Sequence, residues 1–281
     1  MLLFVLLACT GADPTGGSDP AAADGPDPRD RPFDEQVLLV AHNGFNSTAM
    51  GFPVANQALD YEDQLDLGVR GFMLDIYGGA EVGLDEPVLC HGSCVLGSQP
   101  LSEALQRIDG WLLDHPRELV VLVLQDETDP SDIVAAFVAE GLDQRAIVPP
   151  DDGVWPSWAA LTDEGRQMLV TTEGRHEGQP DWLVWTYAIA WDTPYSAKTV
   201  EDFACTPLRG DPSNGLFLVN HFLTDPIASE ALASEANEAD VLRARVDRCE
   251  AEAGQSVNWI AVDFVETGDA VEVVEALQQG D

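Results

Sequence analysis

The sequence predicts an α/β protein built as a single (β/α) barrel of the TIM type. The prediction includes an irregular barrel and a barrel with fewer than eight helices. Three observations predict it. Short apolar runs alternate with helical patterns, as in parallel sheets covered by helices. About seven or eight such runs occur within 281 residues, which suits one barrel domain. Polar residues directly follow several runs, where barrels of this type place catalytic groups. A doubly wound open sheet is the alternative fold.

Buried strands are predicted where apolar residues run together between turn or polar residues. The run 119–124 (LVVLVL) is typical of a parallel strand covered on both faces. The second strand is similar but carries one carboxylate, Asp75, near its end. The predicted strands are 37–41, 69–76, 88–90, 119–124, a weak strand at 146–148, 168–171, 216–219 and 259–264, with 183–190 either a strand or a packing loop.

Helices are predicted between the strands from apolar residues at helical spacing. Leu101, Leu105 and Ile108 follow this spacing after Pro100, which is typical of a helix that begins there. Gly68 is expected to end the helix that precedes the second strand. The predicted helices are 57–67, one that begins at Pro100, 133–140, one around 228–252, and 271–277.

The charge balance excludes several classes of partner. The net charge is -37, from 50 acidic and 13 basic residues, and Lys198 is the only lysine. Nucleic-acid binding needs a basic surface, so we expect no nucleic-acid partner. Tight electrostatic docking on anionic lipid is excluded for the same reason. Most of these charges are interpreted as a soluble, salt-tolerant surface, and we expect a monomer.

The N-terminal residues resemble an export signal. Residues 1–9 (MLLFVLLAC) resemble a bacterial lipoprotein signal segment whose Cys9 becomes acylated, although the basic n-region is missing. A signal peptide cut elsewhere is the alternative, and nine residues are too few to span a bilayer. Residues 10–33 are interpreted as a disordered tether and 34–281 as the barrel domain. We therefore expect an exported protein, extracellular or lipid-anchored to a bacterial cell envelope.

Setting Cys9 aside leaves an even number of cysteines, which in an exported chain suggests disulfides. Three pairings of Cys90, Cys94, Cys205 and Cys249 are possible. We expect Cys90–Cys94, which would hold the loop around His91, and Cys205–Cys249. A Cys/His metal site that includes His91 is the less favoured alternative, because no second pair with metal-ligand spacing is present.

Histidines and carboxylates at strand ends indicate proton-transfer chemistry. In a closed barrel the last strand lies beside the first, so Asp263 is predicted to lie near His42. A carboxylate bonded to one imidazole nitrogen fixes the tautomer and supports the charged ring. The polar residues that follow apolar runs are His42, Asp75, His91, Asp126, His221 and Asp263.

From about Val37 to the C-terminus, the sequence resembles the X-region of phosphatidylinositol-specific phospholipase C and its PLC-like phosphodiesterase relatives. Each matching piece is short, and their order and spacing together carry the resemblance. The pieces are Ala41-His42-Asn43, Gly68-Val69-Arg70 with Leu74-Asp75, Cys90-His91-Gly92, the strand Glu118 to Asp126, Val219-Asn220-His221, and Trp259-Ile260-Ala261-Val262-Asp263-Phe264.

The resemblance implies a phosphoric diester hydrolase or lyase that acts on phosphatidylinositol-like or related phosphodiester lipids, or on soluble inositol phosphodiesters. His42 would be the general base and His91 the general acid, supported by Asp75 and Asp263. Substrate contacts are expected from Tyr77, His221 and Arg70. A Ca²⁺ ion held by Asn43, Asp75 and Asp126 is expected to offset the phosphate charge.

The sequence departs from both branches of this family. Met73 and Gln125 stand at or near positions that are acidic in the calcium-dependent branch, and Tyr77 stands where the calcium-independent bacterial branch has an arginine. Tyrosine cannot neutralise a phosphate as a guanidinium does. Two other hypotheses about the function therefore remain. The protein is either a catalytically degenerate, surface-anchored binding protein or a metal-dependent hydrolase of another ester class. The cations that could replace a metal are Arg70, Arg175 and Arg209.

Overall fold

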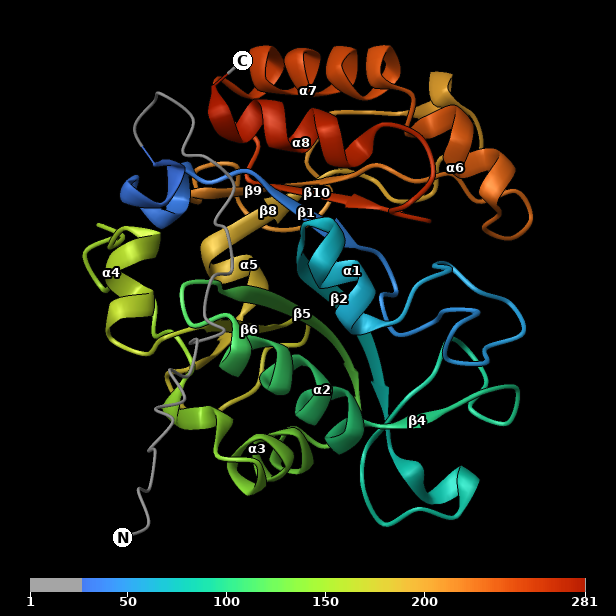
Figure 1. The fold of residues 1–281 in the computed structure, drawn as a ribbon, viewed down its shortest axis with the longest axis vertical. Helices are drawn as coiled ribbons and strands as arrows, with labels where there is room; N and C mark the ends of the chain where they lie inside the picture. The colour runs from blue at the N-terminus through green and yellow to red at the C-terminus, as the bar shows by residue number, and fades with distance from the viewer. Residues whose placement is uncertain (1–26, 281) are drawn as a thin grey trace, which may run out of the picture.

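The computed structural model describes residues 27–280, which form an α/β barrel around a curled parallel sheet (Figure 1). The strand order is β7-β6-β5-β2-β1-β10-β9-β8, and each neighbouring pair is parallel. This confirms the predicted fold class. The strands are β1 (Leu38–Ala41), β2 (Val69–Tyr77), β5 (Val120–Glu127), β6 (Met168–Thr172), β7 (Leu183–Trp185), β8 (Ala190–Asp192), β9 (Leu216–Asn220) and β10 (Trp259–Val262).

The barrel is open at one seam, which corrects the expectation of full closure. β1 pairs with β10, as predicted, with Leu39 opposite Ile260. β7 and β8 instead form the two edges of the described sheet, and only the helix α5 (Thr186–Ile189) joins them in sequence. Parallel pairing needs a crossover of roughly a dozen residues or more. The four residues of α5 are too few, so β7 and β8 cannot pair.

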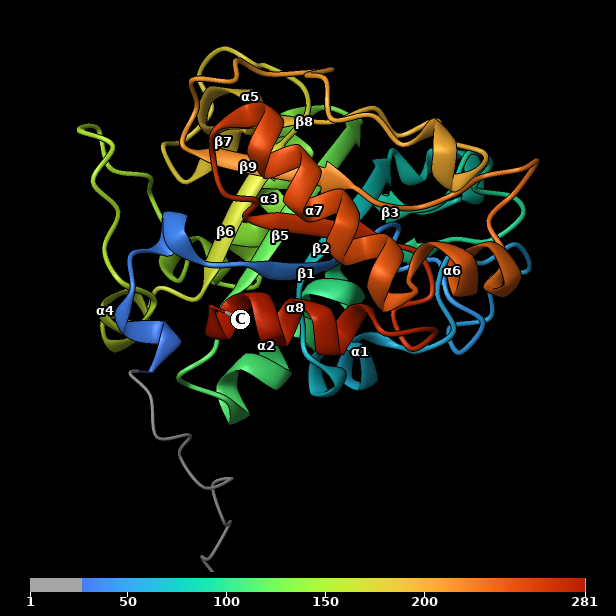
Figure 2. The same ribbon diagram turned by 90° about the horizontal axis from the view of Figure 1, so that it is seen from above.

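Helices wrap the outside of the curled sheet (Figure 2). α8 packs on β1, α7 on α8, α1 on α2 and α2 on α3. The helices α1, α2, α3 and α8 share one apolar core with the outer face of the sheet. The helix predicted around 228–252 is two helices, and 146–148 forms only an isolated bridge from Ala146 to Met168. The remaining α-helices are α1 (Tyr61–Leu67), α2 (Leu101–Asp114), α3 (Pro130–Ala139), α4 (Trp158–Asp163), α6 (Glu230–Ala236), α7 (Ala239–Ala253) and α8 (Ala270–Gln279).

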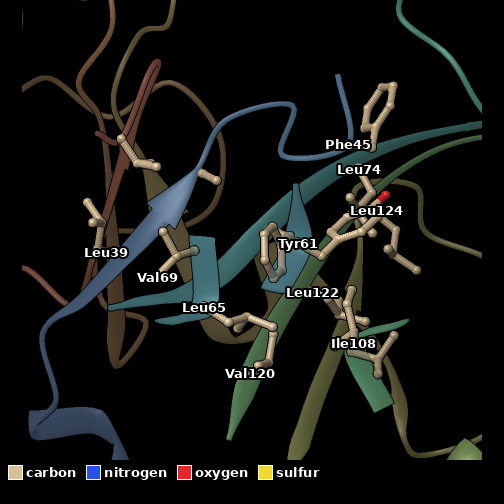
Figure 3. Packing of buried hydrophobic residues seen from close by; sticks show 14 of the residues in the cluster. Leu39, Phe45, Tyr61, Leu65, Val69, Leu74, Ile108, Val120, Leu122 and Leu124 are labelled. Carbon is tan, nitrogen blue, oxygen red and sulfur yellow. The ribbon is translucent and has the colours of Figure 1, made fainter. Parts of the chain in front are cut away.

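The sheet buries side chains on both faces because its strands alternate between two cores. Leu39, Leu122 and Leu124 face the helices, in the layer shown in Figure 3. Val40 and Val121 face the barrel interior. This double burial is why the strands read as continuous apolar runs in sequence.

The N-terminal end of the barrel is plugged by aromatic side chains. Phe33 is 1% exposed and packs against Trp155 in the inner core. Residues 28–35 form two short 3-10 helices, Pro28–Asp30 and Phe33–Glu35. The tether predicted for 10–33 is therefore wrong for residues 27–33, because burial of Phe33 fixes this segment on the fold. Cys9 and the rest of the predicted signal and tether lie outside the described residues.

The described chain contains no helix that is both long and apolar enough to cross a bilayer. Its two ends meet at the plugged end of the barrel. Arg31 donates to the main-chain oxygen of Gln278, and the side-chain oxygen of Gln278 accepts from the Val37 amide at 2.7 Å.

A small hairpin extends β2 beyond the sheet and carries the predicted His91 loop. β3 (Val88–Leu89) pairs antiparallel with the end of β2, and β4 (Gln99–Pro100) pairs with β3. Cys90 bonds to Cys94 directly after β3, and Cys205 bonds to Cys249 of α7. Both predicted disulfides are confirmed.

The two disulfides should differ in their contribution to stability. By loop entropy, the 44-residue separation of Cys205–Cys249 stabilises the fold by about 4 kcal/mol, and the 4-residue separation of Cys90–Cys94 by about 2 kcal/mol. We expect the double alanine variant of Cys205 and Cys249 to lose roughly twice the free energy of unfolding lost by that of Cys90 and Cys94. Urea denaturation at equal pH measures both values. Equal losses would contradict the expectation.

Candidate functional site

A cavity of about 590 Å³ lies at the carboxyl ends of the strands. Strand alternation explains which residues enter it. In β1, β2 and β5, the side chains of Val40, Met73 and Val123 face the barrel interior, and two positions further along lie His42, Asp75 and Gln125. The same alternation brings other strand-end residues to the site. They are Glu173 after β6, Asp192 in β8, Asn220 in β9 and Asp263 after β10.

His42 is held by a buried carboxylate. Its Nδ1 lies 2.8 Å from Oδ1 of Asp263, which is 2% exposed, and its ring stacks on Phe222 with centroids 3.7 Å apart. Because a carboxylate only accepts, Nδ1 carries the proton and Nε2 is left as the acceptor. The side-chain amide of Asn43 lies 3.2 Å from this Nε2. Asp263 therefore lies beside His42, as predicted from the pairing of the first and last strands, and Nε2 is the ring nitrogen that can accept a proton.

The residues that follow β1 and β10 have an unusual backbone conformation. Asn43 has φ 47° and Phe264 has φ 46°, both in the left-handed region that non-glycine residues seldom adopt. Such residues cluster at functional sites, where the surrounding structure holds them in place. Here the turns at Asn43 and Phe264 lie directly beside His42 and Asp263.

His91 enters the same cavity from the disulfide-closed loop. Its Nδ1 lies 3.3 Å from the side-chain amide of Asn46. Burial lowers the pKa of His91, the nearby His42 lowers it further, and Asp263 partly offsets both. The structure thus brings His42 and His91, 49 positions apart in the chain, into one cavity, with different groups at their Nδ1 atoms.

Asp75 lies buried in the cavity wall, 7% exposed. Burial raises the pKa of Asp75 to about 7, the charge of His42 opposes this rise, and Glu173 and Glu127 add to it. A carboxylate with this pKa can change protonation near neutral pH, which suits a role in proton transfer or in binding a hydroxyl group.

The raised pKa of Asp75 predicts a pH-dependent stability. Below the usual pKa of 3.8 the group is neutral in both states, and between this value and about 7 the unfolded state has released its proton while the folded state still holds it. The wild type should therefore lose stability over this range, by roughly 4 kcal/mol in total. We expect Asp75→Asn to be more stable than the wild type at about pH 8, with the difference vanishing near pH 4. Urea denaturation at both pH values tests this, with the exposed Glu81→Gln as control.

Arg209 is fixed in the opposite wall between two carboxylates. Its Nη1 donates to Glu173 at 2.7 Å and its Nε to Asp192 at 2.9 Å. The guanidinium also lies 4.9 Å from the ring centroids of both Tyr187 and Tyr195. Burial alone would lower the pKa of Arg209, but the hydrogen bond with Asp192 and the charge of Glu173 outweigh it and raise the pKa. Arg209 therefore stays charged in the cavity, which Lys198 also lines.

Two predicted site residues lie elsewhere, and strand geometry explains both. Arg70 is near the amino end of β2, where its Nε donates to Glu118 at 2.9 Å and it lines a separate cavity of about 310 Å³. Asp126 alternates with Gln125 and so faces away from the site. Its carboxylate accepts from the Gly174 amide at 2.8 Å and contacts His176. Neither residue lines the candidate site, which corrects both expectations.

His221 and Tyr77 do not line the cavity. His221 is fully buried behind Asn220, where its Nε2 donates to the Ala236 oxygen at 2.8 Å. Burial lowers the pKa of His221 to about 3, and the charge of Arg245 lowers it as well. Tyr77 packs on the cluster that contains the Cys90–Cys94 disulfide. The expectation that these two residues contact substrate is not supported by their positions.

The predicted Ca²⁺ ligands do not fit one ion. Asn43 and Asp75 line the cavity, but Asp126 is engaged on the other face of the sheet. Among residues 27–280, no group of three or more His, Cys, Asp or Glu side chains is arranged to hold a metal. No catalytic step is therefore assigned to a metal, and the cations of the cavity are Arg209 and Lys198.

Solved structures define the class of this fold. The chain resembles phosphatidylinositol-specific phospholipase C from Listeria monocytogenes with a TM-score of 0.61, 15% identity, and coverage of 90% of this chain and 95% of that one. The F249X mutant of the same enzyme from Staphylococcus aureus gives a TM-score of 0.59 and 13% identity, covering 88% and 94%. The protein therefore has a phospholipase C-like barrel fold.

The chain belongs to the PI-PLC X domain family. The family model, PI-PLC X 1, matches residues 30–278. A PI-PLC X domain-containing protein 1 of Arthroderma benhamiae is 28% identical over 267 residues, covering 86% of this chain and 84% of that protein. A PI-PLC X domain-containing protein of Arabidopsis thaliana is 26% identical over 272 residues, covering 88% of this chain and 62% of the plant protein. The family prediction is confirmed.

Proposed function

We propose that the protein is a phosphodiesterase of the phospholipase C type that uses two histidines. The observation that carries this proposal is the shared cavity. His42, with Nδ1 bound by Asp263, and His91 both line it, and Arg209 lies in its wall. A base, an acid and a cation around one cavity are the groups needed to cleave a phosphodiester.

In the proposed reaction, Nε2 of His42 removes the proton from a hydroxyl vicinal to the phosphate. The hydroxyl oxygen attacks phosphorus and forms a cyclic phosphodiester, while the bond from phosphorus to the leaving alcohol oxygen breaks. His91 gives that oxygen a proton. Asp263 holds the imidazolium that forms on His42. Water is not consumed in this step, so the products are a cyclic phosphate and an alcohol.

The phosphate charge is proposed to be met by Arg209, with Lys198 at the rim. This assignment replaces the Ca²⁺ ion expected from the sequence. A guanidinium matches the oxygens of a phosphate better than other side chains do. Its fixed position between Glu173 and Asp192 means that little rotamer freedom is lost when the phosphate binds.

The proposed substrates are phosphatidylinositol-like lipids or soluble inositol phosphodiesters. Internal attack needs a hydroxyl next to the phosphate, which an inositol ring supplies. Buried polar groups such as Asp75 and Asn220 can bind further ring hydroxyls. The names of relatives and structural neighbours refer to the same lipid class. Glycerophosphodiester and sphingolipid-type phosphodiesters are the alternatives within the same reaction type.

A chromogenic inositol phosphodiester tests the reaction, with wild type, EDTA and added Ca²⁺ as separate arms. We expect turnover with a cyclic phosphate as the first product, and EDTA should not abolish it because the described residues do not form the predicted metal site. Loss of turnover in EDTA with recovery in Ca²⁺ would overturn the role of Arg209. Absence of turnover on inositol, glycerol and sphingolipid-type phosphodiesters would overturn the proposed activity itself.

A binding protein on a degenerate barrel is the second candidate. The observation that favours it is the charge of the cavity wall, where Glu173 and Asp192 both bond to Arg209 and offset its charge. Asp75 adds a further carboxyl. Such a wall can bind a polyhydroxyl ligand without cleaving it. Calorimetry that detects inositol binding, together with inactivity on every phosphodiester, would favour this candidate.

We also propose that the protein is exported. The two disulfides support this, because such bonds persist in oxidising compartments. A relative from Arthroderma benhamiae, 24% identical, is described as a secreted protein. Lipid attachment at Cys9 would anchor the protein to a membrane, and mass spectrometry of the mature N-terminus tests it. An unmodified or absent Cys9 would contradict the anchor.

A further inference from the structure

A single loop brings four residues to the candidate cavity. It runs from residue 193 to residue 215, between β8 and β9, and Tyr195, Ser196, Lys198 and Arg209 all line the cavity. Arg209 is the proposed phosphate ligand, and Lys198 is the only lysine of the chain. The placement of both cations therefore depends on how this loop is held.

The helix α7 holds this loop through one of its faces. Arg245, Arg248 and Cys249 are spaced at i, i+3 and i+4, so they lie on the same side of the helix. Cys249 is bonded to Cys205 of the loop. Nη2 of Arg248 donates to the main-chain oxygen of Phe203 at 2.7 Å. The middle of the loop is thereby attached to α7 by a disulfide and by a hydrogen bond.

Arg245 joins the start of the loop to the same region. Its Nη2 donates to Oγ1 of Thr193 and to the main-chain oxygen of Ala204, both at 3.3 Å, which uses both hydrogens of that nitrogen. Its Nη1 lies 3.4 Å from Nδ1 of His221, which accepts because Nε2 of that ring donates to a main-chain oxygen. One guanidinium therefore connects two points that lie far apart along the loop.

Arg245 is a buried cation whose partners carry no charge. It is 3% exposed, its hydrogen-bond partners among the described residues are Thr193, Ala204 and His221, and its buried Nε has no partner. Burial lowers the pKa of Arg245 to about 9, as does the charge of Arg248, so the group is still charged at neutral pH. A buried charge without a counter-charge is costly compared with an apolar side chain. Stability of the core does not explain this residue, whereas attachment of the loop does.

We propose that Arg245 is a positioning residue that fixes the loop on α7 and so places Lys198 and Arg209 for an anionic ligand. Its first contact, with Thr193, lies directly after Asp192, whose carboxylate accepts from Nε of Arg209 at 2.9 Å. The role toward the ligand rests on the proposed function, whereas the attachment of the loop stands without it.

The second contact of Arg245, with Ala204, lies close to the turn that carries Lys198. The main-chain amides of Lys198 and Thr199 donate to the carboxylate of Asp202 at 3.1 and 3.0 Å, and Ala204 follows two positions later. Each bond from Arg245 to the loop is therefore close in sequence to the carboxylate that holds one of the two cation-bearing residues.

The single lysine gives a direct readout of the loop. Protein labelled with ¹⁵N-lysine contains one labelled main-chain amide, that of Lys198, whose bond to Asp202 makes its chemical shift and hydrogen exchange sensitive to the loop conformation. Arg245→Met keeps an apolar stem and removes every donor. We expect the Lys198 signal to move toward the value of an unfolded chain, with exchange faster by roughly 10-fold. An unchanged signal in folded Arg245→Met would overturn the proposal.

Ligand binding separates positioning from a general effect on the fold. Calorimetry with an inositol cyclic phosphate and with free inositol compares a charged and an uncharged ligand. In Arg245→Met we expect affinity for the phosphate to fall roughly 10-fold, because the two cations are no longer preorganised, and affinity for inositol to stay near the wild-type value. Equal losses for both ligands would overturn the positioning role. If free inositol does not bind, unchanged affinity for the phosphate would overturn it.

Two further variants complete the test. Thr193→Val removes one of the two bonds at nearly constant volume, and we expect the same changes at roughly 3-fold. If Arg245→Met does not fold, an unchanged Lys198 signal in Thr193→Val would overturn the proposal. Arg107→Met is the matched control, because it removes a half-buried guanidinium of α2 that is bonded to Glu62, and it should leave the Lys198 signal unaltered.

The outcomes distinguish this inference from the proposed function. A wild-type protein that neither binds the inositol phosphate nor cleaves a phosphodiester would remove the proposed function and, with it, the role of Arg245 toward the ligand. The Lys198 signal would still decide whether Arg245 attaches the loop to α7.

Discussion

Replacement of His42 by alanine is expected to lower turnover of a phosphodiester substrate by about 10²–10⁴, the usual contribution of a positioned general base. The reason is geometric. Asp263 fixes the proton of His42 on Nδ1, so Nε2 is the nitrogen that accepts the proton of the hydroxyl in the proposed reaction. Asp263→Asn should also be strongly impaired, because an amide nitrogen toward Nδ1 would favour the wrong tautomer. Single-turnover kinetics of the cyclising step measures both effects.

The control for His42 is His115→Ala. His115 stacks on Trp111 at the end of α2 and does not line the cavity, so its loss should leave turnover near the wild-type value. His42→Ala removes one hydrogen-bond partner of the buried Asp263 and could therefore destabilise the fold. Thermal unfolding of each variant shows whether a loss of turnover comes from the missing imidazole or from unfolding. Full activity of folded His42→Ala would remove the two-histidine mechanism.

Replacement of Arg209 by lysine is expected to lower kcat by about 10²–10³, the cost of losing one preorganised donor to a charged oxygen. Lysine keeps the positive charge between Glu173 and Asp192, so stability should suffer less than with a neutral residue. Lysine lacks the planar guanidinium group. Only that group can bond both carboxylates and at the same time face the cavity. Steady-state kinetics on the inositol phosphodiester, with unfolding curves beside it, measures the effect.

Arg175→Lys is the matched control for Arg209. Arg175 lies over the ring of Trp185 at 5.3 Å, two positions after Glu173, but it does not line the cavity. The same change of cation should therefore leave kcat and KM unaltered there. If Arg209→Lys folds and retains wild-type kcat, the phosphate must be neutralised by another group, and Lys198 would be the next to replace.

The strands and the strand-end residues could be predicted from sequence because each strand buries both faces. Apolar runs marked the strands, and the residues that follow them include His42, Asp75 and Asp263. Because both faces are buried, a run such as 119–124 shows no alternation of apolar and polar residues. The sequence therefore does not show which face of the sheet a given side chain is on. Asp126 was therefore expected in the site, whereas Gln125 occupies it.

Loop residues could not be found in this way. Asn46 and Asn56 lie in an irregular segment, and no periodicity reports that their amides lie beside His91 and Asp263. Arg209 was named among three possible cations, but only the fold shows that it faces the cavity. Glu173 could have been found, since it follows the apolar run 168–171 at the same alternation as the other strand-end residues.

The meeting of residues 31 and 278 behind the sheet has a practical consequence. Both ends of the folded part lie at the plugged end of the barrel, opposite the cavity that His42 and His91 line. A purification tag, a solid support or a second domain fused to either end would stand clear of incoming ligand. The ends are also close enough for a short linker to join them, so a circular permutant cut in a surface turn should retain the cavity in its native form.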